Sequence, residues 1–417
     1  MSIRGKSDGT FIVIVGTGFA GLAMGIRLKQ AGIDDFTILE QAHGIGGTWR
    51  DNDYPGAACD VESHLYSFSF EPNPNWTREF SAQREILAYL EHCADKYGLR
   101  EHIRLGTTVA RASFDDREGV WSVETREGPS INARVFISAC GGLSRPEYPE
   151  IAGLGSFAGK AMHSSRWDHA YPLDGKRVAI IGTGASAIQI VPAIAPRVAR
   201  MHVFQRTPPW ILPKPDAEIS GQKRTLYGRV PFVQRLVRDA IYIRRELLAV
   251  GFVVEPCLMG VMRGLALRHL ARSVSDRELR RKLTPQYMIG CKRILPTNDF
   301  YPALERENVE LVTDRIRELR ADGIVTHDGA ERQLDAIVLA TGFRAAEEVA
   351  PFEIRGRYGH DLNTVWRDGA EAYLGTTVAG FPNAFMLVGP NTGLGHNSMI
   401  FMIESQVTYI LSIIQAM

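Results

Sequence analysis

Two short apolar runs, each followed by glycines and then by a second apolar pattern, are the clearest periodic features of the chain. The first is FIVIV at residues 11–15, followed by GTGFAG and LAMGIRL. The second is VAII at residues 178–181, followed by GTGASA and IQIVPAIA. Continuous apolar runs rich in β-branched residues are typical of strands buried on both faces of a parallel sheet. The pattern therefore predicts two strand–turn–helix units of an α/β fold.

The first glycine turn has the spacing of a phosphate-binding turn. Gly16 permits the tight turn, Gly18 lets the backbone approach a pyrophosphate, and Gly21 lets helix and strand pack closely. The helix N-terminus adds free N–H groups and the positive end of the helix dipole. A second strand, FTIL, leads into Glu40, whose carboxylate is placed to accept hydrogen bonds from a ribose. The residues expected to contact a dinucleotide here are Gly16, Gly18, Phe19, Ala20, Gly21 and Glu40.

The second glycine turn differs from the first in ways that bear on the choice of nucleotide. The first two glycines are kept, but Ala187 stands where the third would be. After the next strand, RMHVF, the position that matches Glu40 is taken by neutral Gln205 or its neighbour, and Arg206 follows. Replacing the acid with a cation removes repulsion from a 2′-phosphate and supplies a forked donor to it. We therefore expect NADP rather than NAD, although Arg206 could also be a solvated charge at a strand end.

A third apolar run, LDAIVLATGF at residues 334–343, completes the order of motifs. In flavoproteins with two dinucleotides, such a strand returns the chain from the nucleotide-binding insert to the flavin domain. Flavin accepts hydride and NADPH donates it, so FAD in the first unit and NADPH in the second is the economical pairing. The expected fold class is α/β, with two Rossmann-like dinucleotide-binding domains, one for FAD and one for NADP.

The order of these motifs also predicts the domain organisation. Residues 1–145 are expected to form the first part of the FAD-binding domain, 146–344 the NADP-binding domain, and 345–417 the return segment of the FAD-binding domain. Between about 211 and 289, strand patterns are few, and VPFVQRLVRDAIYIRRELLAV places apolar residues at helical spacing. We interpret this segment as a helical insertion in the NADP domain that forms part of the substrate pocket.

Composition narrows the class of protein. The 417 residues carry 48 Lys plus Arg against 47 Asp plus Glu, a net charge of +1, so no nucleic-acid partner is expected. The five cysteines form no CxxC and no regular ladder, which favours a reduced, cytoplasmic chain without a metal site. The run ELLAVGFVVEPCLMGVM contains Glu255 and Pro256 at its centre, so no transmembrane segment is expected. The sequence gives no indication of the oligomeric state.

Three further blocks carry a resemblance to a known family. FAGKAMHSSRWD, residues 157–168, fits the fingerprint FxGxxxHxxxW followed by Pro or Asp. GGTWRDNDYPGAACD, residues 46–60, fits a GGTW…YPG…D block, and GPNTGLGHNSMIFMIE, residues 389–404, fits a closing flavin-domain block. With both glycine turns in order, the chain resembles the flavin-dependent Baeyer–Villiger monooxygenases of the single-chain type that uses FAD and NADPH. The fingerprint residues in register are Phe157, Gly159, His163, Trp167 and Asp168.

The resemblance implies an oxygenation reaction. In this family NADPH reduces FAD, the reduced flavin adds O2 to form a C4a-peroxyflavin, and a ketone becomes an ester or lactone, with sulfoxidation as a side activity. The implied partners are O2 and a small-molecule ketone. Two alternatives stay open. One is an N-oxygenating flavin monooxygenase, whose fingerprint usually ends in Tyr or Phe where Trp167 stands. The other is an uncoupled flavoprotein that oxidises NADPH and releases H2O2.

The segment CKRILPTNDFY contains a pair of adjacent cations, Lys292 and Arg293. By resemblance, Arg293 is catalytic and stabilises the peroxyflavin, Asp60 is the carboxylate that pairs with it, and Lys292 joins Arg206 at the 2′-phosphate. Successive side chains of an extended segment point to opposite faces, so the two cations can serve different ends of the cofactors. A guanidinium stays charged when desolvated, but it then needs a counter-charge. The alternative is a solvated pair at a strand end.

The resemblance also assigns the other cofactor contacts. Ala58 and Cys59 precede Asp60 on one segment and are expected to line the nicotinamide side. The remaining FAD contacts implied are Gly47, Thr48, Trp49, Asp60, Tyr66, Val109 and Met399. The NADP contacts implied are Ala58, Cys59, Gly182, Thr183, Gly184, Ala185, Ser186, Gln189, Arg206, Thr207, Lys292 and Arg293.

Some positions depart from the family pattern, and two histidines have expected roles of their own. Arg50 and Asp51 follow the GGTW block, where many members carry aromatic residues, so one wall near the cofactors is more polar. His163 is expected to anchor the linker between domains, whereas His396 is either a flavin-side group or a turn residue. Relatives often continue beyond the closing block, whereas this sequence ends at Met417. The sequence therefore does not indicate which segment closes the pocket.

Overall fold

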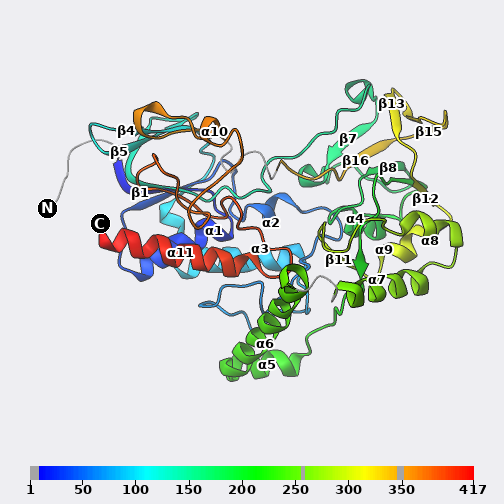
Figure 1. The fold of residues 1–417 in the computed structure, drawn as a ribbon, viewed down its shortest axis with the longest axis horizontal. Helices are drawn as coiled ribbons and strands as arrows, with labels where there is room; N and C mark the ends of the chain where they lie inside the picture. Colours follow the sequence, from blue (N-terminus) through cyan, green and yellow to red (C-terminus); the bar gives the residue numbers. More distant parts are fainter. Residues whose placement is uncertain (1–8, 255–258, 345–351) are drawn as a thin grey trace.

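The computed structural model describes residues 9–254, 259–344 and 352–417, and it has two sheet-based lobes with a group of helices beside them (Figure 1). The first lobe contains an eight-stranded sheet in the order β17-β4-β5-β6-β1-β2-β3, with β18 also paired to β6. Strands β6, β1 and β2 are parallel, and Ile12 of β1 lies opposite both Val135 and Phe36. The strands are β1 (Gly9–Val15), β2 (Phe36–Leu39), β3 (Ile103–Arg104), β4 (Val109–Asp115), β5 (Val120–Thr125), β6 (Ile131–Ser138), β17 (Glu353–Arg355) and β18 (Ala384–Met386).

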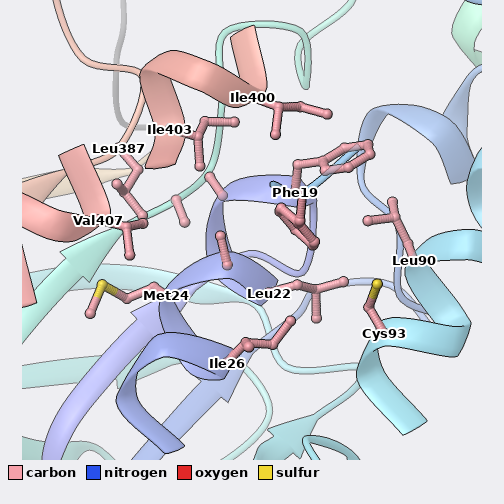
Figure 2. Packing of buried hydrophobic residues seen from close by; sticks show 14 of the residues in the cluster. Phe19, Leu22, Met24, Ile26, Leu90, Cys93, Leu387, Ile400, Ile403 and Val407 are labelled. Carbon is pink, nitrogen blue, oxygen red and sulfur yellow. The ribbon is translucent and has the colours of Figure 1, made fainter. Parts of the chain in front are cut away.

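Helix α1 (Phe19–Gln30) anchors the first glycine turn, because it is buried on nearly every side. It lies between α11 (Met399–Ala416) and α3 (Gln83–Lys96). A helix that is apolar all round is stable only inside a core, so the start of α1 is fixed against the sheet. The side chains labelled in this core are Phe19, Leu22, Met24, Ile26, Leu90, Cys93, Leu387, Ile400, Ile403 and Val407 (Figure 2).

The second lobe repeats the same strand–turn–helix plan. Its sheet is parallel in the order β12-β9-β8-β16-β7, and Val178 of β8 lies opposite both Met201 and Ala336. The apolar run at 334–343 forms β16, which is shorter than the run and ends before Thr341. The elements are β7 (Lys160–His163), β8 (Arg177–Ile181), α4 (Ala187–Ile194), β9 (Arg200–Phe204), α9 (Phe300–Leu304), β12 (Val309–Val312), β16 (Ala336–Leu339) and the antiparallel β13 (Ile316–Arg320), β14 (Gly323–Thr326) and β15 (Glu331–Gln333).

The expected helical insertion is present between β9 and β12. Pro231 opens its long helix α6, where its missing N–H has no helical partner to lose. The short parallel pair β10 (Ile211–Leu212) and β11 (Leu295–Pro296) joins its two ends. Its helices are α5 (Gly221–Arg229), α6 (Pro231–Ala249), the π-helical η4 (Val250–Val254), α7 (Met259–Ser273) and α8 (Arg277–Leu283).

Some sequence expectations are not decided by these elements. Glu255 and Pro256, which interrupt the apolar run of the insertion, lie outside the described residues. The domain limits at residues 145 and 344 stay predictions. The remaining short elements are α2 (Thr48–Asp51), η1 (Arg100–His102), η2 (Leu154–Ser156), η3 (Ser164–Arg166), η6 (Arg357–Gly359) and α10 (Leu362–Val365).

Within the described part of the chain, α11 is the one helix long and apolar enough to cross a membrane by length and composition. Its mean hydropathy is 1.4, and 33% of it is buried inside the protein. A core helix passes the same test. Ile403, Val407 and Ile410 of α11 are buried in the core cluster that also holds α1. The helix therefore has a packing role in this fold.

The YPG turn of the first lobe touches helix α4 of the second lobe at Gly56. This glycine has φ +84°, and a Cβ there would lie 2.6 Å from the carbonyl oxygen of Gln189. Only a glycine therefore fits without a shift of backbone. The turn that leads toward Asp60 is thus packed directly on the second lobe.

We expect Gly56→Ala to destabilise the protein by more than the strain of its φ alone. The left-handed conformation costs an alanine about 1–2 kcal/mol, and the clash with Gln189 adds roughly 1–3 kcal/mol. Gly119→Ala is the matched control, since Gly119 has φ +68° and open space around its Cβ position. Thermal or urea unfolding of both variants measures the difference, and equal destabilisation would contradict the contact.

Candidate active site

A cavity of about 590 Å³ opens at the carboxyl ends of β1, β2 and β6. Its volume is within the range of about 300–1,000 Å³ that ligand sites usually have. In open α/β sheets, ligands bind at this edge. The predicted FAD residues that line it are Gly16, Gly18, Phe19, Ala20, Glu40, Gly47, Thr48, Trp49, Tyr66, Val109 and Met399.

The glycine turn at the floor of the cavity closes only because Gly16 and Gly21 have no side chains, and a Cβ on Gly16 would lie 2.6 Å from the carbonyl oxygen of Ala139. A Cβ on Gly21 would lie 1.9 Å from the carbonyl oxygen of Gly16, so the helix could not approach the strand. Gly18 is the N-cap of α1, and no side chain among the described residues caps this helix. The first N–H groups of the helix are therefore available at the cavity. This arrangement fits the pyrophosphate of a dinucleotide.

Glu40 lies at the end of β2 and is buried, as a ribose acceptor should be. Its carboxylate accepts hydrogen bonds from the Thr17 backbone N–H at 3.0 Å and the Thr17 hydroxyl at 2.6 Å. The backbone N–H of Ala42 donates to its other oxygen at 3.0 Å. These bonds fix the carboxylate at the cavity wall, which Glu40 lines.

Arg50, one of the two departures from the family pattern, belongs to the same wall. Its guanidinium lies 3.2 Å from Glu40 and 2.8 Å from Asp51, and it donates to the carbonyl oxygen of Gly44 at 2.6 Å. Arg50 and Asp51 both line the cavity. The extra polarity expected from the sequence is therefore present, and it is concentrated beside the ribose-binding acid.

Aromatic side chains form another wall of the cavity. The Trp49 indole N–H donates to the Tyr66 hydroxyl at 3.1 Å, and the two rings meet edge to face at 5.5 Å. Phe19 lies edge to face with Tyr66 at 5.3 Å. Burial is the main reason that the pKa of Tyr66 rises well above its ordinary value, with Asp60 adding to the rise and Arg293 opposing it. The phenol of Tyr66 thus stays neutral, and it is close enough to Asp60 and Arg293 for both charges to affect its pKa.

Asp60 and Arg293 form the bidentate ion pair that the resemblance implies. One terminal nitrogen of Arg293 donates to both carboxylate oxygens of Asp60 at 2.7 Å, and its Nε donates to one of them at 3.1 Å. The attraction of Asp60 is the largest cause of a raised pKa for Arg293, so the cation keeps its proton. Half of the Arg293 side chain is exposed, against 21% of Asp60. The pair is next to the cavity rather than in its wall. Tyr66 does line the cavity, and the charges of Asp60 and Arg293 both act on its pKa.

Residues 58–59, predicted to line the nicotinamide side, are attached to the rest of the structure mainly through their backbone. The Cys59 thiol is buried in the core, and burial, followed by Asp60, raises its pKa to about 12. A thiol in that state is neutral. The carbonyl oxygen of Cys59 instead accepts a hydrogen bond from Lys214 at 3.2 Å. A contact between Cys59 and a cofactor would therefore have to use its backbone.

The second glycine turn resembles the first, but its helix starts later. Thr183 in the turn donates to the carbonyl oxygen of Thr207 at 3.2 Å, which joins the turn to the segment after β9. Ala187, in place of the third glycine, is fully buried as the first residue of α4. Arg206 is exposed at the end of β9, as a phosphate-binding cation would be. The other predicted NADP residues of this turn are Gly182, Gly184, Ala185 and Ser186.

Lys292 and Arg293 have different partners, although the chain bends at Lys292 and the nearest strand, β11, begins only at Leu295. The Lys292 ammonium lies 5.1 Å from the centre of the Tyr287 ring, whereas Arg293 binds Asp60. Lys292 is exposed. Its predicted role with Arg206 at a 2′-phosphate stays a prediction.

Gln189 has a position that sequence reasoning did not foresee. Its amide nitrogen donates to the carbonyl oxygen of Ala58 at 2.9 Å, and its amide oxygen accepts a hydrogen bond from the Tyr54 hydroxyl at 2.9 Å. This residue of α4 therefore joins the second lobe to the YPG segment of the first. Its predicted contact with NADP stays a prediction.

His163 joins two parts of the second lobe, in agreement with its expected structural role. Its Nε2 lies 3.0 Å from the carbonyl oxygen of Gly342, and its Nδ1 lies 2.9 Å from the Ser165 hydroxyl. Burial lowers its pKa, so the ring is neutral. The His396 side chain lies 3.4 Å from Glu246 of α6.

Several residues near the site were missed from the sequence. Ala139, Cys140 and Gly141 follow β6 directly, and their place at the carboxyl end of a central strand could have identified them. Lys214 is separated from Cys59 by 155 positions, so no local pattern indicated it. The other cavity-lining residues missed include Thr107, Thr108, Arg126, Arg145, Arg166, Phe352 and Val388.

The chain is similar to known proteins in sequence and in fold. A family described as pyridine nucleotide-disulphide oxidoreductase matches residues 13–225. A Baeyer–Villiger monooxygenase of Pseudomonas aeruginosa is 52% identical over 406 residues, which cover 97% of this chain and 77% of that protein. A second one, from Streptomyces coelicolor, is 49% identical over 96% of this chain and 77% of its own length.

Solved structures give the same result. Cyclohexanone monooxygenase from Rhodococcus sp. Phi1, bound to NADP⁺, is 32% identical and has a TM-score of 0.88 over 98% of this chain and 85% of that chain. The sequence identity, the shared fold and the matching motifs together show that the chain belongs to the Baeyer–Villiger monooxygenase family.

Proposed function

We propose that this protein is an NADPH- and O2-dependent flavoprotein monooxygenase that converts ketones to esters or lactones, with sulfoxidation as a side activity. The observation that carries the proposal is the bidentate pair of Arg293 and Asp60 beside the large cavity. The overall reaction consumes one ketone, O2, NADPH and a proton, and it yields the ester, water and NADP⁺. The NADP⁺-bound cyclohexanone monooxygenase supports the choice of nucleotide, and together with the Baeyer–Villiger relatives it supports the substrate class.

The residues of the cavity fit FAD. The open N-terminus of α1 would hold the pyrophosphate and Glu40 the ribose, while the wall of Trp49 and Tyr66 would contact the flavin ring. When bound, flavin supplies hydride acceptance and oxygen activation. The polar ends of Trp49 and Tyr66 satisfy each other, which leaves their apolar faces to exclude water from this wall.

The role proposed for Arg293 follows from charge. Oxygen transfer to a carbonyl develops negative charge, and a fixed cation placed in advance lowers the energy of that charge. The raised pKa of Arg293 keeps the guanidinium protonated across the working pH range. Asp60 holds the guanidinium at two points and neutralises it while no substrate charge is present. Arginine is suited to this because a lysine could lose its proton on desolvation.

The second lobe is proposed to bind NADPH through its glycine turn, Arg206, Thr207 and Lys292. Helix α4, which follows this turn, contacts the YPG segment through Gln189 and at Gly56. The two proposed nucleotide sites therefore meet at this contact. We further propose a cytoplasmic location, which the lack of paired cysteines among the described residues and the absence of a CxxC in the sequence support.

Arg293→Ala is expected to separate NADPH oxidation from oxygen transfer. Removing a donor from a site of developing negative charge costs about 10²–10³ in rate, so ester formation should fall by that factor. NADPH should still reduce the flavin, and the two electrons should then pass to O2, which is released as H2O2. Arg293→Lys is the control that keeps the charge and loses the fork. Product analysis against NADPH consumed, with a cyclic ketone, measures the result; an unchanged ester yield would refute the role.

Arg206→Ala is expected to weaken the binding of NADPH but not that of NADH. A charge-assisted hydrogen bond contributes about 1.5–3 kcal/mol, so the KM for NADPH should rise roughly 10- to 100-fold. The KM for NADH should stay nearly constant, because NADH has no 2′-phosphate. Steady-state kinetics with both nucleotides test this expectation. An equal loss for both would show that Arg206 only supports the fold.

A further inference from the structure

Helix α6 of the insertion contacts the segment that carries Asp60 and Tyr66. One nitrogen of Arg238 donates to the carbonyl oxygens of His64 at 2.9 Å, Leu65 at 3.0 Å and Ser67 at 2.9 Å. Gln234, one turn earlier, donates to the carbonyl oxygen of Asn73 at 2.7 Å. A helix from the second lobe thus supplies the hydrogen bonds of an irregular segment that borders the cavity.

Arg245, on the same helix, joins three groups around Asp60. Its Nε donates to the buried carboxylate of Glu62 at 2.6 Å. One of its terminal nitrogens donates to the backbone carbonyl oxygen of Asp60 at 3.1 Å, and the other donates to that of His396 at 3.2 Å. Only 16% of the Arg245 side chain and 8% of Glu62 are exposed. Arg244 also pairs with Glu62, from a far more exposed side chain.

The geometry of this contact requires an arginine. A planar guanidinium presents donors in fixed directions, so one side chain can hold a carboxylate and two carbonyl oxygens at once. An ammonium group is a compact point charge without that fork. Removing Arg245 would leave Glu62 buried with a single, more exposed partner, which is costly for a buried charge. The segment around Asp60 would then lose a fixed contact with α6 and with the loop at His396.

Asp60 is held at both ends by arginines. Its carbonyl oxygen accepts a hydrogen bond from Arg245, and its carboxylate binds Arg293. The two arginines are 48 positions apart in sequence and belong to different elements of the second lobe. A displacement of the Asp60 backbone would therefore move the Arg293 guanidinium, which has half of its side chain exposed and Asp60 as its ion-pair partner.

We infer that Arg245, together with Glu62, is a positioning unit that holds Asp60 so that Arg293 stays aligned with the cavity. The helical insertion thereby sets the geometry of oxygen transfer. The inference rests on the proposed monooxygenase function. Arg245 is a positioning residue, because it acts through Asp60 and Arg293.

Arg245→Met and Arg235→Met form a matched pair for testing the inference. Both remove one positive charge from α6 and keep a long side chain, but Arg235 is exposed. The first readout is hydrogen–deuterium exchange of the holoprotein without ketone. Arg245→Met should speed exchange in peptides from residues 60–67 and 394–398 by about tenfold, because their contacts open locally. Exchange in β1 and β8 should stay unchanged, and Arg235→Met should behave as wild type.

The second readout is the yield of ester per NADPH consumed. A small misplacement of a charged group can cost about 10²-fold in rate, so Arg245→Met should lower this yield roughly 10- to 100-fold, with hydride transfer nearly constant. In an Arg293→Ala background, Arg245→Met should have no further effect, because groups that act as one unit are not additive. Arg245→Lys should recover part of the yield, since it keeps the charge opposite Glu62.

The outcomes separate the two proposals. If the wild-type protein forms no ester from any ketone, the proposed function fails, whatever the exchange data show. If the wild type forms ester and Arg245→Met matches Arg235→Met in both readouts, the inference fails and the function stands. Additive losses in the double variant would also overturn the inference, because they would indicate a general structural role. Flavin content and thermal unfolding establish that each variant is folded.

Discussion

The ion pair between Arg293 and Asp60 is the interaction on which the proposed site depends. A cation close to a cofactor cavity is useful only if it stays charged and stays in place, and the carboxylate of Asp60 provides both conditions. Its partial exposure makes the electrostatic contribution to stability modest. Its importance is therefore geometric, because the Nε–H and a terminal N–H of Arg293 bind the two carboxylate oxygens side by side and fix the direction of the guanidinium.

Most of the surrounding structure can be understood as support for the short segment that carries Asp60. Gly56 lets the chain lie against α4, and Gln189 binds the backbone of Ala58. Beyond Asp60, Arg238 and Arg245 of α6 bind the carbonyl groups of the same segment. The contacts come from α4 of the second lobe and from α6 of the helical insertion, although the segment lies next to the cavity of the first lobe. The site is thus formed where the lobes meet, which is where a hydride donor and a hydride acceptor must approach each other.

Sequence reasoning identified the parts of the site that have local patterns. The two glycine turns and Glu40 follow from short spacings, because a strand, a turn and a helix fix their own geometry. The aromatic wall of Trp49 and Tyr66 was expected only from the family resemblance. The pairing of Asp60 with Arg293 spans 233 positions and was reached by resemblance alone. Arg245, Glu62 and Lys214 have neither a local pattern nor a family motif, so only their contacts in the folded protein identify them. Cys59 stays a predicted cofactor contact, and the burial of its thiol limits that contact to its backbone.

The most direct measurement is a crystal structure of the protein with FAD and NADP⁺ bound. The account predicts that FAD occupies the cavity beside Trp49 and Tyr66, and that the Arg293 guanidinium contacts the isoalloxazine ring while still bonded to Asp60. A structure in which Arg293 points to solvent, out of reach of the ring, would contradict the account.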